Sequence, residues 1–65
     1  SRLLELSASD LVIRLGDVMS DREIADAVGA SRSQIWMIRN EQRRPTSDTF
    51  RNLQALAVER GVLKS

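Results

Sequence analysis

Arg32 and Ser33 stand at the start of a short predicted helix, and Met37 follows them at a spacing that places all three on one side. A guanidinium can donate two hydrogen bonds to guanine O6 and N7, a hydroxyl can pair with several bases, and a thioether can pack against a thymine methyl group. These three residues are the candidate base-contacting side chains. The alternative for Arg32 is a surface salt bridge with Asp21 or Glu23.

Other residues around this helix could hold it against a phosphate backbone, which positions a protein without reading sequence. Arg43 and Arg44 follow the helix, where one strand should pass, and backbone N–H groups are free near Ser20. The candidate backbone-contacting or supporting residues are Ser20, Asp21, Trp36, Asn40, Arg43 and Arg44, with Thr46 and Ser47 as weaker candidates. The alternatives are a solvated basic loop for the arginine pair, and packing of Trp36 against the next helix or loop.

The composition argues against other kinds of function. The chain has no His, Cys or Tyr, so it offers no obvious nucleophile and base and lacks the commonest metal ligands. We therefore expect no enzyme, no metal, no cofactor and no small-molecule substrate. Its apolar runs are only a few residues long, so we expect no membrane span and a cytoplasmic, nucleoid-associated protein of a bacterial or phage-infected cell.

The charge is unevenly distributed along the chain, although the net charge is only +1. Residues 1–30 hold three basic and six acidic side chains, whereas residues 31–65 hold seven basic and three acidic ones. The basic half begins at the predicted helix that carries Arg32. This asymmetry is typical of a domain with one face that meets nucleic acid.

Residues 20–39 predict two short helices joined by a tight turn. Ser20 with Glu23, and Ser31 with Gln34, have the spacing of the capping box that starts a helix. Gly29 lies between the two helices, where a positive φ is expected. The inward-facing residues are predicted to be Ile24, Ala25, Val28, Ile35 and Ile38. Two helices with this turn are the signature of a helix-turn-helix.

The rest of the chain predicts helices on either side of this motif. Residues 8–16, capped by Ser7 or Ser9, should form a helix whose inward face is Leu11, Val12 and Leu15. Another should start at Thr46 or Ser47 and end at Gly61, burying Phe50, Leu53, Leu56 and Ala57, with Val62 and Leu63 folding back onto the core. We expect Leu3, Leu4 and Leu6 to pack on the core or across a dimer. The prediction is one all-α domain over residues 1–65.

The residues quoted above resemble the helix-turn-helix family of phage Cro and repressor proteins, also called lambda-repressor-like or Xre-like. The resemblance runs from about Ser20 to Ala57. The matching positions are Ser20, Glu23, Ile24, Ala25, Val28, Gly29, Ala30, Ser31, Ile35, Ile38, Asn40, Arg44, Pro45, Phe50, Leu53 and Ala57. The resemblance implies a compact domain of four or five helices that binds a pseudopalindromic operator in double-stranded DNA as a homodimer. It places base reading on Arg32, Ser33 and Met37, and phosphate binding on Ser20, Asp21, Asn40 and Arg44.

The chain departs from the family pattern at two places. Members often carry Gln at the position of Asp21, so we expect Asp21 to orient Arg32 by a charge-assisted hydrogen bond. Asn40-Glu41 replaces a frequent Asn-Gly. The leading hypothesis is a transcriptional repressor or Cro-like regulator. The alternatives are the DNA-recognition module of a larger recombinase, transposase or restriction-control protein, and a helical protein-interaction module that docks through Trp36 and Met37.

Overall fold

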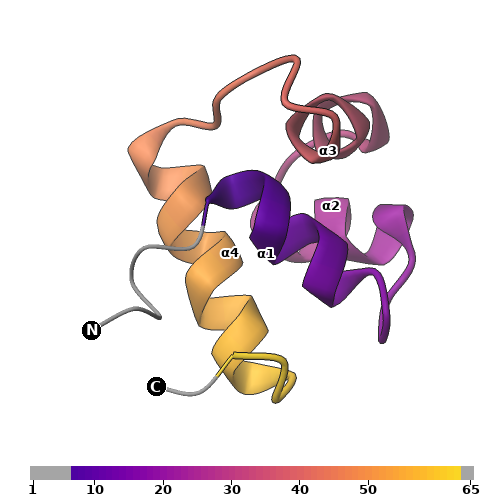
Figure 1. The fold of residues 1–65 in the computed structure, drawn as a ribbon, viewed down its shortest axis with the longest axis vertical. Helices are drawn as coiled ribbons and strands as arrows, with labels where there is room; N and C mark the ends of the chain where they lie inside the picture. The colour runs from indigo at the N-terminus through magenta and orange to yellow at the C-terminus, as the bar shows by residue number, and fades with distance from the viewer. Residues whose placement is uncertain (1–6, 64–65) are drawn as a thin grey trace.

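Four helices make up the part of the chain that the computed structural model describes, residues 7–63 (Figure 1). They are α1 (Ala8–Leu15), α2 (Asp21–Val28), α3 (Arg32–Arg39) and α4 (Ser47–Glu59). No strand occurs within these residues. The all-helical prediction is confirmed, and α1 ends one residue earlier than expected.

A hydroxyl side chain caps the start of every one of these helices, which explains why they begin where they do. Each cap accepts a hydrogen bond from the backbone N–H three residues later: Ser7 from Asp10, Ser20 from Glu23, Ser31 from Gln34 and Thr46 from Thr49. A cap of this kind typically stabilises a helix by about 1 kcal/mol. Because helices of eight residues are marginal alone, these caps must act together with packing.

One aliphatic core holds the four helices together. Its buried members are Leu11, Val12, Leu15, Met19, Ile24, Ala25, Val28, Ile35, Ile38, Leu53, Leu56, Ala57 and Leu63. The inward faces predicted from helical spacing are therefore confirmed, except that Phe50 is only half-buried and packs at the edge of the core. Met19 is buried just before α2, whereas Val18 beside it is 52% exposed.

The helices cross rather than forming a parallel bundle (Figure 1). α1 contacts α3 and α4, and α2 contacts the same two helices. The segment of residues 40–46 passes over one end of the molecule from α3 to α4. α3 is thereby left at one side of the domain, supported from beneath by α1 and α2.

The end of the described chain folds back as expected. Gly61 has a φ of +78°, and the N–H groups of Val62 and Leu63 both donate to the carbonyl of Ala57. Leu63 is consequently buried, so little of its surface is open to a second copy of the chain. The leucines of residues 1–6, which were expected to pack on the core or across a dimer, lie outside the described residues.

The dimensions fit one small domain. The radius of gyration is 10.3 Å, close to the value of about 11 Å for a folded chain of this length. None of the helices in residues 7–63 has the length and apolar character needed to cross a membrane.

Candidate nucleic-acid interface

A complete capping box starts each of the helices α2 and α3. The Glu23 carboxylate accepts from the Ser20 backbone N–H at 3.0 Å, and the Ser20 hydroxyl accepts from the Glu23 N–H at 3.2 Å. At the start of α3, Gln34 and Ser31 make the same reciprocal pair at 3.0 and 3.1 Å. Both boxes predicted from the sequence are confirmed.

Gly29 closes α2 in the left-handed conformation, with a φ of +74°. The backbone N–H groups of Gly29 and Ala30 both donate to the carbonyl of Ala25. A Cβ added at Gly29 would meet no atom within 4 Å, so the backbone conformation rather than space favours glycine here. The predicted positive φ at this position is confirmed.

The candidate base-contacting residues share one side of α3. Arg32 and Ser33 are exposed in its first turn, and Met37 is half-buried one turn later. Trp36 is 54% exposed on the same side, so packing against α4 or the following loop does not bury it. Ile35 and Ile38 occupy the opposite, buried side. No salt bridge links Arg32 to Asp21 or Glu23 within the described residues.

The sequence predicts that Asp21 orients Arg32, and this prediction is wrong. Asp21 is paired with Arg39 instead. The guanidinium of Arg39 donates from both terminal nitrogens to the carboxylate, with Nη1 at 2.9 Å from Oδ2. The reason is geometric. Arg32 adjoins the end of α2, whereas Asp21 starts that helix, about 10 Å away along its axis. The end of α3 returns to the start of α2, which brings Arg39 to Asp21.

A second contact secures the same end of α3. The hydroxyl of Ser9, buried in α1, donates to the backbone carbonyl of Arg39 at 2.8 Å. That carbonyl belongs to the last turn of α3, where no later helical N–H is available. The sequence offered both Ser7 and Ser9 as caps for α1; Ser7 has this role, and Ser9 binds α3 instead.

The chain leaves α3 through a glutamate in the left-handed conformation, which non-glycine residues rarely adopt. Glu41 has a φ of +58°, while its N–H donates to Ile38 and that of Gln42 donates to Met37, the two bonds of a Schellman motif. Asn40, a candidate phosphate ligand, directs its side-chain nitrogen to the carbonyl of Trp36 at 2.9 Å. The departure from Asn-Gly therefore places a glutamate where glycine is favoured.

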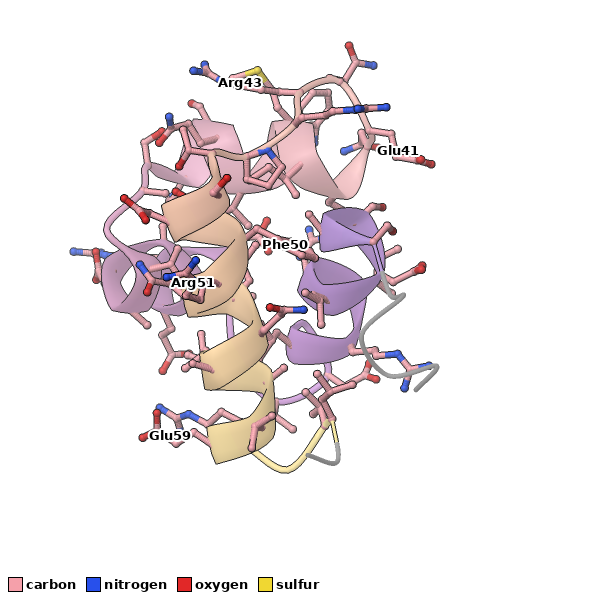
Figure 2. The ribbon with its side chains drawn as sticks, turned by 90° about the vertical axis from the view of Figure 1, so that its left-hand side faces the viewer. Glu41, Arg43, Phe50, Arg51 and Glu59 are labelled. Atoms are coloured by element: carbon pink, nitrogen blue, oxygen red, sulfur yellow. The ribbon has the colours of Figure 1, made fainter. Side chains whose placement is uncertain are left out.

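Arg43 and Arg44 are both exposed on the segment after α3. Figure 2 shows Arg43 at the outer edge of the domain, pointing away from its body, with Glu41 on the same segment. Beneath this segment lies an open cavity of about 610 Å³, which the sequence did not predict. Phe50 borders the cavity, lying between α4 and α1.

The electrostatics of the candidate interface are simple. Hydrogen bonds from the backbone N–H and the hydroxyl of Ser20 lower the pKa of the Glu23 carboxyl below its ordinary value. α3 carries no acidic residue, and Arg39 neutralises Asp21 beside its end. Among residues 7–63, no cluster of three or more His, Cys, Asp or Glu side chains is placed to hold a metal ion.

The structure thus brings Arg32, Ser33, Trp36 and Met37 together on one exposed side, with Arg43 and Arg44 beyond its end. It places Ser20 and Asp21 near the last turn of α3 instead. The sequence analysis did not predict the contact of Ser9 with the Arg39 carbonyl or the pairing of Arg39 with Asp21. Comparison of the chain with models of protein families, with curated proteins and with solved structures gives no match.

Proposed function

We propose that this protein binds double-stranded DNA sequence-specifically as a transcriptional regulator, a repressor or Cro-like protein. In this proposal residues 20–39 act as a helix-turn-helix of the lambda-repressor-like kind, and α3 enters the major groove. The observation that carries the proposal is the exposed side of α3, which has Arg32 and Ser33 in its first turn while the opposite side is buried. Residues near the start of a groove-binding helix are the ones that reach base edges.

The charges around α3 support a polyanionic partner. Arg32 lies at its start, Arg43 and Arg44 follow its end, and the helix contributes no carboxylate that would repel phosphate. As a dimer, two copies would present their α3 helices roughly 34 Å apart, on one face of the duplex. Such a regulator would work in the cytoplasm, at the nucleoid.

One experiment tests the proposal directly. The protein is incubated with a randomised duplex pool at low and moderate salt, and the retained DNA is sequenced. We expect an inverted repeat, bound less tightly as salt rises because phosphate contacts release counterions. Arg32→Ala should cost roughly 1–3 kcal/mol and relax the preference at one base pair in each half-site.

Arg43→Ala should behave differently, since a phosphate contact carries no sequence information. It should weaken binding to all sequences alike and reduce the salt slope by about 1. Arg51→Ala is the matched control, because Arg51 is exposed on α4 instead (Figure 2). Unchanged strength and sequence preference in Arg32→Ala would overturn the assignment of α3 as the reading helix.

The exposure of Trp36 favours a second candidate, a protein-interaction module. A tryptophan 54% open to solvent is also the kind of residue that anchors protein interfaces. Binding through such an apolar contact should persist at high salt, whereas binding to phosphate should not. A chain that retains no DNA even at low salt would point to this candidate.

A further inference from the structure

Two of the four polar side chains of α3 are engaged within the protein. Gln34 uses its side-chain oxygen to accept from the Ser31 backbone N–H, and Arg39 is paired with Asp21. The polar side chains of the helix that remain are Arg32 and Ser33, and both belong to its first turn. Hydrogen bonding to a partner is therefore concentrated at the start of α3.

The second half of the helix offers a different surface. Ile35 and Ile38 are buried and Arg39 is paired with Asp21, so this half offers Trp36 and Met37 to a partner. The indole has a single N–H donor and no acceptor, and the thioether is at most a weak acceptor. Asn40, just beyond them, has its side-chain nitrogen directed at the Trp36 carbonyl. This half of α3 is suited to apolar contact rather than to hydrogen-bonded readout.

The surrounding charges identify what such an apolar surface could contact. Arg32 precedes it, Arg43 and Arg44 follow it, and Asp21 near its end is neutralised by Arg39. The complementary partner is anionic and must carry an apolar group between its charges. In the major groove of DNA, the apolar group at the base edges is the C5-methyl group of thymine.

We propose that Trp36 and Met37 read the C5-methyl groups of thymine, and that Trp36 is a specificity-determining residue. This inference rests on the proposed function and deepens it. Each half-site would then be read in two ways: by hydrogen bonds at the start of α3, and by methyl contacts one turn later. A thymine should follow the base pair that Arg32 contacts, on the side toward which α3 runs.

The test replaces thymine by deoxyuridine, which lacks only that methyl group. In the duplex selected from the randomised pool, each thymine is replaced in turn and the dissociation constant is measured. We expect one thymine or two adjacent thymines per half-site to matter, each loss weakening binding about fourfold, as for one buried methyl-sized group. With Trp36→Ala, the replacement should have little effect at the thymine that Trp36 contacts, while a thymine that Met37 contacts should keep its response.

Trp36→Ala should leave the fold intact because the side chain is mostly exposed, which thermal unfolding checks. Val58→Ala is the matched control, since Val58 is an exposed apolar residue on α4, and it should keep the full response to deoxyuridine. Equal loss in Trp36→Ala and in the natural chain would overturn the role of Trp36. DNA binding that ignores every replacement would overturn methyl reading and leave the proposed function standing. A chain that retains no duplex at low salt would overturn both.

Discussion

The two connections that flank α3 both end a helix with a residue in the left-handed conformation, but they use different residues to do so. Gly29–Ser31 joins α2 to α3 in three residues, with glycine at the left-handed position and a capping box directly after it. Residues 40–46 join α3 to α4, and there the left-handed position is held by Glu41, although glycine would suit it better. The first connection is short and locally favourable, whereas the second is longer and carries strain.

The contrast between the two connections indicates that the placement of α3 against α2 is held more firmly than the path of residues 40–46. The relation of α2 to α3 is set by the backbone hydrogen bonds of the turn and by the capping box at Ser31, and the pairing of Arg39 at the end of α3 with Asp21 at the start of α2 reinforces it. The segment of residues 40–46 instead displays two exposed arginines above an open cavity. Within this segment Thr46 caps α4, and Glu41 and Gln42 close α3, whereas Arg43 and Arg44 are exposed to solvent.

The largest effect should come from breaking the ion pair that joins the end of α3 to the start of α2. Arg39→Ala leaves the half-buried Asp21 carboxylate without its partner, so we expect a loss of about 1–2 kcal/mol in the free energy of unfolding, allowing for partial solvent screening. Denaturant unfolding measures it. Arg51→Ala, at an exposed site, should change the value by less than about 0.5 kcal/mol. Equal effects from the two substitutions would show that the ion pair contributes nothing to stability.

Glu41→Gly should give both connections a glycine at the left-handed position. Relieving a left-handed non-glycine residue should raise the free energy of unfolding by about 1 kcal/mol, after allowing for the greater freedom of glycine in the unfolded chain. Gly29→Ala should lower it by a similar amount for the opposite reason. Glu41→Asn controls for the lost charge, and should stabilise less than glycine does. A Glu41→Gly protein that melts no higher than the natural chain would mean that the conformation carries no strain.

The smallest effect should be a pH dependence of stability that only one of the two capping boxes produces. The box of α2 uses the titratable acid Glu23, whereas the box of α3 uses the amide Gln34. The folded state lowers the pKa of Glu23, so its contribution to stability is present above the unfolded-state pKa and is lost as pH falls through the folded-state value. Glu23→Gln should therefore make the melting temperature fall less steeply between about pH 6 and pH 3. Parallel pH profiles for the two proteins would exclude a role for this carboxylate.

The parts of the fold that the sequence predicts well depend on residues close together in the chain. Ser31 and Gln34 are three residues apart, and the left-handed Gly29 follows directly from where the pattern of α2 stops. The buried faces, such as Ile35 with Ile38, follow from helical spacing alone. These features are local, so their physics is visible before any packing is known.

The parts that were missed depend on how the helices pack. Arg39 pairs with a residue 18 positions away, and Ser9 binds a carbonyl 30 positions away. Choosing between Arg32 and Arg39 as the partner of Asp21 requires knowing which end of α3 returns to the start of α2. The glutamate at the left-handed position was also unforeseen in its conformation, although the sequence marked Asn40-Glu41 as unusual.

The double attachment of Arg39 has a kinetic consequence. Its side chain is held by α2 and its carbonyl by α1, so the last turn of α3 is ordered by the rest of the domain before any partner arrives. Association of a partner with α3 would then require no folding step and little loss of conformational entropy in the helix. Encounter rates should be set by diffusion, orientation and electrostatic steering by the arginines.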